Sequence, residues 1–179
     1  MTETIITEST STAIINAPIE LVDIADWLFN LPDAEYQRCS PAHLAAGFST
    51  SDDGKRMSLN VETIGGNLMV QHYVEDIGEK HHVRLVSTSD VITPTGRSKS
   101  GVVWELKVKA LDANRCEFSN HVIGRTTPEY WDHLGKSGIP FEVAKQAQAT
   151  ASSAHNEQET PMFAGSLERK ALKQHAAAK

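Results

Sequence analysis

Residues 55–125 read KRMSLNVETIGGNLMVQHYVEDIGEKHHVRLVSTSDVITPTGRSKSGVVWELKVKALDANRCEFSNHVIGR. Apolar and polar residues alternate along this stretch, and short turn sequences such as Gly65-Gly66 interrupt the alternation at hairpin spacing. The pattern predicts five antiparallel strands joined by short turns, at residues 55–64, 67–76, 81–93, 98–111 and 115–125. Because a strongly twisted sheet of this length tends to curl, we expect a curved sheet.

The segment before this stretch predicts one further strand and several short helices. Residues 9–16 are rich in β-branched side chains, which favour a strand, and Pro18 closes it. An amphipathic pattern predicts a helix over residues 19–29, and a second short helix follows at 33–38. Ser40-Pro41 is typical of a helix start, so we expect another helical turn that ends at Gly47.

The segment after the strands has the pattern of helices. Thr127-Pro128-Glu129 combines a hydroxyl cap, a first-turn proline and an acidic side chain, which is a helix-start signature. Gly135, Gly138 and Pro140 interrupt this helix, and an alanine-rich helix is expected from Pro140 to about Gln158. Thr160-Pro161 then predicts the start of a final helix.

Composition excludes several classes of protein. A net charge of −6, with 40% hydrophobic and 22% charged residues, is ordinary for a globular protein and argues against nucleic acid as a partner. No apolar run is long enough to span a membrane, and the N-terminus lacks a signal-peptide pattern. Cys39 and Cys116 lie outside any CxxC spacing, so we expect buried, reduced thiols in a cytoplasmic protein.

Two segments resemble a known superfamily. TAIINAPIELVDIADWLFN (12–30) is similar to the opening strand and first helix of the START and birch-pollen-allergen-like proteins, also called the SRPBCC or polyketide cyclase and lipid-transport group. SGVVWELKVKALDANRCEFSNHVIG (100–124) resembles their late hairpin, and the likeness covers about residues 9–155. The interruption at Gly135 to Pro140 departs from the single long helix that is usual in the family.

The resemblance implies an α+β helix-grip fold, in which a curved antiparallel sheet of six or seven strands wraps around a long C-terminal helix. It implies one ligand-binding domain over residues 1–179, with a core at about 9–155 and a helical extension at 156–179. A pocket between sheet and helix would take a hydrophobic ligand. The superfamily contains carriers, cyclases and hydrolases, so the fold does not choose among them.

Alternation along each strand predicts which side chains face this pocket, because successive side chains point to opposite sides of a sheet. The predicted inward residues are Met57, Leu59 and Val61; Leu68, Val70, His72 and Val74; Val83, Leu85, Ser87 and Ser89; Val102, Trp104, Leu106 and Val108; and Cys116, Phe118, Asn120 and Val122. Small side chains at helical spacing on the long C-terminal helix, among them Val143 and Ala147, would leave space for a ligand between this helix and the sheet. The alternative reading is that alanine is simply the best helix former.

From these faces we predict a ligand-binding set and one catalytic candidate. The predicted ligand-binding residues are Val70, His72, Leu85, Ser87, Trp104, Leu106, Phe118, Asn120, Val143 and Ala147. Polar groups in an apolar wall need a partner, which a ligand can supply. For His72 the competing interpretation is a core histidine that is already hydrogen-bonded.

Motifs for metals and nucleotides are missing from the sequence. There is no HExxH and no paired CxxC, so we expect neither a metal nor a cofactor. Gly135-Lys136-Ser137 resembles the end of a phosphate-binding loop, but Tyr130 replaces the first glycine. Glu62, Glu75 and Glu105 fall on predicted outward faces, which argues against a buried pair of carboxylates.

Three functions remain open. The preferred one is binding of a small hydrophobic organic molecule, such as a lipid, a polyketide or another aromatic compound. The second is a cyclase, dehydratase or hydrolase that uses His72 as general acid and base and Asn120 to polarise a carbonyl. The third is a protein-interaction module that uses the outer sheet face or the final helix.

Overall fold

The computed structural model describes residues 3–177, and it consists of one curved sheet with helices on one of its faces. In chain order the elements are β1 (Ile5–Ile15), η1 (Ile19–Leu21), α1 (Ile24–Leu28), α2 (Asp33–Cys39), β2 (His43–Thr50), β3 (Arg56–Ile64), β4 (Asn67–Glu79), β5 (His82–Thr93), β6 (Gly96–Asp112), β7 (Arg115–Thr126), α3 (Pro128–Ser137) and α4 (Phe141–Ala177).

All seven strands pair antiparallel in one sheet, in the order β1-β7-β6-β5-β4-β3-β2. The five strands expected from residues 55–125 are confirmed within a few residues at each end. Gly65 and Gly66 form the β3–β4 turn with φ angles of 58° and 80°, which glycine adopts without strain. The α+β helix-grip architecture expected from the resemblance is therefore present, with seven strands.

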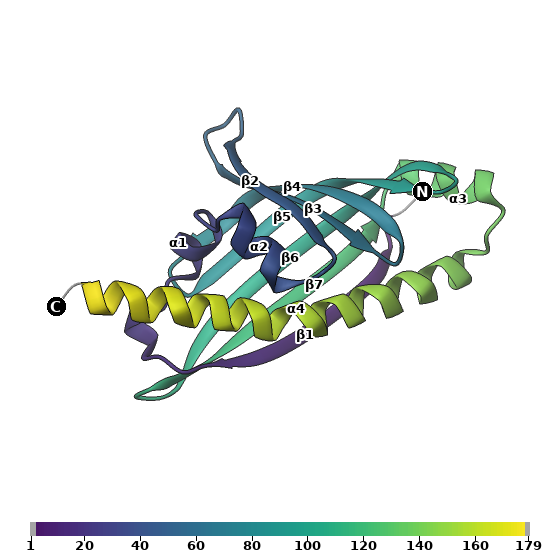
Figure 1. Ribbon diagram of the computed structural model, residues 1–179. Helices are drawn as coiled ribbons and strands as arrows, with labels where there is room; N and C mark the ends of the chain where they lie inside the picture. Colours follow the sequence, from purple (N-terminus) through teal and green to yellow (C-terminus); the bar gives the residue numbers. More distant parts are fainter. Residues whose placement is uncertain (1–2, 178–179) are drawn as a thin grey trace.

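α4 lies across the sheet, with α1 and α2 near its C-terminal half and α3 near its N-terminal end (Figure 1). Asp23 caps α1 by accepting a hydrogen bond from the Asp26 amide at 2.8 Å. Thr127 caps α3 by accepting one from the Tyr130 amide at 3.1 Å, as its sequence signature predicts. α3 ends at Gly138, which has the left-handed conformation common at helix ends.

The packed core lies between the sheet, α1, α2 and the second half of α4. Trp27 and Tyr36 from the short helices meet Phe118 of β7 and Phe163 of α4 there, and all four are buried. α3 has no buried residue among those described, and the buried residues of α4 begin only at Ser152. One half of the molecule is thus solidly packed, whereas the half under α3 and the start of α4 is not.

Three sequence expectations about the elements are wrong. The single helix expected over residues 19–29 is divided into η1 and α1, because the backbone of Val22 between them is extended. The turn expected to run from Ser40 to Gly47 is mostly β2, because the chain from His43 onward pairs with β3 along the sheet edge. Pairing in this hairpin overrides the local helix-start signal.

α4 also continues unbroken through Pro161, where a new helix was expected. Pro161 lies on the exposed side of α4. The carbonyl that loses its usual amide partner there can be hydrated, so the helix survives the proline.

Both cysteines are free and buried, as expected.

Within residues 3–177, no helix is both long and apolar enough to cross a bilayer.

Candidate functional site

A cavity of about 330 Å³ lies between one end of the sheet, α3 and the first half of α4. Ile64 and Val91 line it from the sheet, Leu134 from α3, and Ala144 and Ala151 from α4. The alanines leave this volume open, because a larger side chain on α4 would point into it. The walls are therefore mainly apolar, which suits an organic ligand.

Ser98 is the polar side chain of most interest in this cavity. It lies on β6 and lines the cavity wall, and its residue is 7% exposed. Its hydroxyl group is buried and has no hydrogen-bond partner among the described residues. An unpaired buried hydroxyl costs about 1–3 kcal/mol, so a bound molecule that pairs with it gains from doing so.

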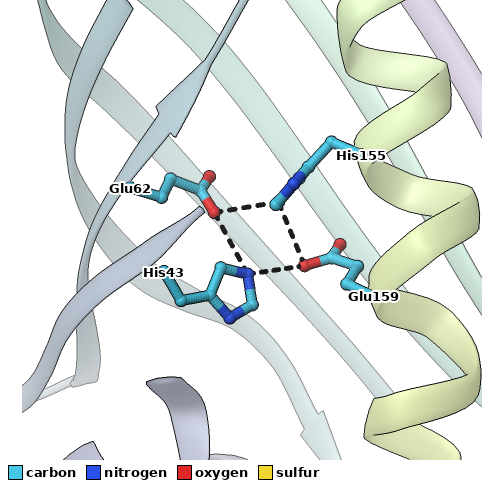
Figure 2. Close-up of side chains that lie close together, drawn as sticks. All are labelled: His43, Glu62, His155 and Glu159. Carbon is cyan, nitrogen blue, oxygen red and sulfur yellow. Dashed lines mark hydrogen bonds and ion pairs between the residues drawn. The ribbon is translucent and has the colours of Figure 1, made fainter. Parts of the chain in front are cut away.

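Four ionisable side chains meet beside the packed core, and we call them the His–Glu cluster: His43, Glu62, His155 and Glu159 (Figure 2). They come from β2, β3 and α4, and His155 and Glu159 are one helical turn apart. His43 Nε2 lies 3.1 Å from Glu159 Oε2 and 3.4 Å from Glu62 Oε2. His155 Nε2 lies 3.1 Å from Glu62 Oε2 and 3.3 Å from Glu159 Oε2.

Neighbouring groups hold each part of the cluster in place. His43 Nδ1 lies 2.8 Å from the Tyr36 carbonyl oxygen, and the Tyr36 hydroxyl donates to Glu62 Oε2 at 3.1 Å. Asn120 donates to Glu159 Oε1 at 3.0 Å. Trp104 Nε1 in turn donates to the Asn120 side-chain oxygen at 2.8 Å. The cluster is thus fixed by a second layer of hydrogen bonds.

A second, smaller cavity of about 30 Å³ adjoins the His–Glu cluster. Glu62, His155 and Glu159 line it, and its volume suffices for a water molecule. Ile64 lines both this cavity and the large one. Along α4 the large cavity is lined up to Ala151 and the small one begins at the next residue, so the two are neighbours.

Mutual interaction shifts the pKa values in the cluster. Burial alone would lower the pKa of His155, but its hydrogen bonds with Glu159 and Glu62 outweigh burial and raise that pKa to about 10. Burial would raise the pKa of Glu159, but hydrogen bonds with His155 and His43 hold it below its usual range. Burial, assisted by the charges of Glu62 and Glu159, raises the pKa of Tyr36 well above its ordinary value. These shifts favour the charged forms of His155 and Glu159, which stabilise each other as an ion pair.

The predicted inward faces of β5, β6 and β7 agree with the structure. Leu85, Leu106 and Phe118 are fully buried in the core. Ser87 is buried too, but it already accepts a hydrogen bond from the His72 amide at 2.9 Å and contacts Ser89. Of the predicted ligand-binding set, Trp104 lines the small cavity and Ala147 the large one.

The predicted inward faces of β3 and β4 are wrong. The buried residues there are Ser58, Asn60 and Glu62 on β3 and Met69, Gln71 and Tyr73 on β4. Val70 and His72 consequently point to the other face, and the His72 side chain is 43% exposed, 4.0 Å from Asp90. On β3 the buried face is mainly polar and the apolar residues Met57, Leu59 and Val61 lie on the other face, so the expectation that the apolar face is inside fails there. On β4 both faces carry apolar residues, and alternation does not say which face is inside.

Two further placements also differ from expectation. Glu62 is buried instead of outward, so a close pair of buried carboxylates does exist. Val143 is 59% exposed and does not line either cavity, because it lies on the outer side of α4.

His43, His155 and Glu159 were not predicted as site residues, and Glu62 was predicted to face outward. The available signal was the pair His155-x-x-x-Glu159 in a helical segment, because residues four apart share a helix face. His43 and Glu62 carry no such signal, since they reach the cluster only through the pairing of β2 with β3.

Comparisons with known proteins found similarity in structure but not in sequence. No family model matches the chain, and no curated protein matches it in sequence. The Zhui aromatase/cyclase from Streptomyces sp. R1128 superposes with a TM-score of 0.69 at 13% identity, over 94% of this chain and 96% of that one.

Two other solved structures give the same fold. A START superfamily protein from Mycobacterium smegmatis has a TM-score of 0.52 at 13% identity, over 93% of this chain and 98% of that one. The di-domain aromatase/cyclase StfQ from the steffimycin biosynthetic pathway has a TM-score of 0.59 at 10% identity. This chain is covered over 95% of its length there, and StfQ over 52%. The fold is therefore that of START-like proteins and aromatase/cyclases.

Proposed function

We propose that this START-like chain binds a small, mainly apolar organic molecule in the large cavity between the sheet, α3 and α4. The observation that carries the proposal is the apolar cavity of about 330 Å³, which falls in the range of about 300–1,000 Å³ common for ligand pockets. Each 100 Å² of apolar ligand surface buried there would contribute about 2.5 kcal/mol.

The similar structures support an aromatic or polyketide-like ligand. Two of them are described as aromatase/cyclases, and they share the sheet and long helix that enclose the cavity here. At 10–13% identity this likeness concerns the fold, so the ligand class is our proposal for this chain.

Displacement of a fluorescent apolar dye by a panel of fatty acids, quinones and aromatic polyketides tests the proposal. We expect at least one class to bind with a stoichiometry of one per chain. Ala144→Phe fills the cavity and should weaken binding at least tenfold. Ala154→Phe is the matched control, because Ala154 is exposed on the same helix and does not line the cavity. Equal binding by both variants would place the ligand elsewhere.

A second candidate function is catalysis on the bound molecule. It is favoured by one observation: the small cavity beside the large one is lined by Glu62, His155 and Glu159. The catalytic groups would then be these three side chains, because His72 lies on the opposite face of the sheet. Turnover of the ligands found above, compared between the wild type and Glu159→Gln, separates the two functions. A catalyst should lose turnover by orders of magnitude, whereas a carrier should show no turnover in either form.

A further inference from the structure

The His–Glu cluster has the composition of a site for a divalent metal ion. It presents two imidazole nitrogens and two carboxylate oxygens, and these four atoms all lie within 4.8 Å of one another. Nitrogen and oxygen donors of this kind suit Zn²⁺ and other first-row divalent ions. The sequence offers no motif for it, because the four residues come from three separate segments.

The tautomer of His43 indicates what must lie between the four groups. Its Nδ1 lies 2.8 Å from the Tyr36 backbone carbonyl, which can only accept, so Nδ1 carries the hydrogen. Nε2 of a neutral His43 then directs a lone pair at two carboxylate oxygens, 3.1 and 3.4 Å away. That arrangement is repulsive unless a proton or a metal cation lies between them.

The charge of the cluster leads to the same requirement. The side chains of Glu62 and Glu159 are 6% and 8% exposed, and two buried carboxylates need two compensating positive charges. Within residues 3–177, no lysine or arginine forms an ion pair with either carboxylate. The charge is balanced either by protons on the imidazole and carboxyl groups or by one divalent cation with both histidines neutral.

The nitrogen-to-oxygen spacings in the cluster fit a metal. Zn²⁺ binds nitrogen and oxygen ligands at about 2.0–2.1 Å in a tetrahedron, which places neighbouring ligand atoms about 3.3–3.4 Å apart. The four nitrogen-to-oxygen distances in the cluster are 3.1, 3.1, 3.3 and 3.4 Å (Figure 2). The two remaining pairs, nitrogen to nitrogen and oxygen to oxygen, lie within 4.8 Å. A tetrahedral ion would have to draw these two pairs together toward about 3.3–3.4 Å.

The surroundings also have the form of a metal site. Histidine ligands usually donate their second nitrogen to a carbonyl, and ligating carboxylates are usually hydrogen-bonded. Tyr36 supplies both of these contacts, to His43 and to Glu62, and Asn120 supplies the one to Glu159. The adjoining cavity of about 30 Å³ has room for a water molecule.

We propose that His43, Glu62, His155 and Glu159 bind one divalent transition-metal ion, and Zn²⁺ is the first candidate because it accepts mixed nitrogen and oxygen ligands. Tyr36 and Asn120 act as positioning residues that hold the ligands in place. This site is distinct from the large apolar cavity, so it does not depend on the organic ligand proposed above.

The test starts from the full chain, stripped with a chelator and then titrated with ZnCl₂ by calorimetry and with CoCl₂ by visible absorption. We expect one ion per chain and, with Co²⁺, the intense absorption of a four- or five-coordinate site. Glu159→Gln should weaken Zn²⁺ binding by more than a hundredfold. Tyr36→Phe should weaken it by about 10–100-fold, since it removes one supporting hydrogen bond and keeps the ligands.

His121→Gln is the matched control, because His121 belongs to a partly exposed group with Glu8 and Glu105 and should not affect binding. If Glu159→Gln does not fold, the Zn²⁺ affinity of Tyr36→Phe and the Co²⁺ spectrum of the wild type still test whether the cluster binds a metal ion. The proposal is overturned if the folded wild type binds no stoichiometric Zn²⁺, or if it leaves Co²⁺ with its aqueous spectrum. The cluster would then be held together by protons alone.

Discussion

Asn120 connects three parts of the molecule through one side chain. It accepts from Trp104 on β6 and donates to Glu159 and Thr160 on α4, and it is fully buried. A buried amide suits this position because it pairs the Trp104 indole nitrogen and one Glu159 oxygen, which are polar groups away from water. Strand alternation predicted that Asn120 is a polar residue on the inward face of its strand, and its burial is confirmed.

Asn120→Ala should lower the free energy of unfolding by about 2–4 kcal/mol, because it leaves the Trp104 indole nitrogen and a Glu159 oxygen without their partner. Urea denaturation followed by circular dichroism measures the loss. Asn114→Ala, in an exposed turn, should change stability by less than about 0.5 kcal/mol. A loss below 1 kcal/mol at Asn120 would mean that water replaces the amide.

Glu105, on the outer face of the sheet, contributes to the free energy of unfolding in a pH-dependent way. Burial would raise its pKa, but hydrogen bonds from Lys107, His82 and His121 lower it to about 2. A carboxyl group whose pKa is lowered by folding stabilises the folded state at any pH above its pKa in the unfolded chain, 4.5. This stabilisation disappears as the pH falls from 4.5 toward the folded-state pKa of about 2.

Glu105→Gln should therefore cost about 1 kcal/mol at pH 7, a modest value because water screens the partly exposed ion pairs. The difference between the wild type and Glu105→Gln should shrink steadily from pH 5 to pH 2. Unfolding free energies at several pH values provide the measurement. Glu79→Gln, at an exposed strand end, serves as the comparison and should show no such trend.

At the scale of elements, β1 and β7 approach each other closely at Gly124. A methyl group on this residue would lie 2.5 Å from the Thr7 Cγ2 atom, and threonine is stiff because it branches at Cβ. Gly101 lies on the neighbouring strand β6, where an added methyl group would meet Arg125 Cβ at 3.6 Å, an ordinary contact.

Gly124→Ala should consequently destabilise the protein by about 1–3 kcal/mol, whereas Gly101→Ala should be close to neutral. Thermal unfolding of the two variants side by side is the measurement. Equal effects would show that β1 shifts freely on the sheet edge and that the close contact at Thr7 is not maintained.

The elements also show what a sequence can predict. Hairpin turns such as Gly65-Gly66 depend on a few adjacent residues, and the strands of residues 55–125 were predicted nearly to their ends. β2 was not, because the local helix-start signal at Ser40-Pro41 conceals a strand that only its pairing with β3 reveals. The same limit explains the reversed faces of β3 and β4. Which face is inside depends on α4 and the short helices, which bring His155 and Tyr36 next to Glu62.

The whole molecule divides into a packed half and a hollow half, and α4 spans both. Phe163 and Leu167 of α4 are buried against the core, whereas Ala144 and Ala151 border the large cavity. The His–Glu cluster lies at the boundary, where His155 and Glu159 follow the last cavity-lining turn. A bound organic molecule and the cluster would therefore be neighbours.

This division predicts uneven hydrogen exchange along a single helix. Local opening costs least where few side chains are buried, so the amides of α3 and of residues 141–151 should exchange faster than those of residues 156–171. Hydrogen–deuterium exchange followed by mass spectrometry resolves the two regions. A molecule that fills the large cavity should slow exchange in the first region and leave the second unchanged. Uniform protection along α4 would contradict the division, because it would mean that the helix opens as one unit whatever lies beneath it.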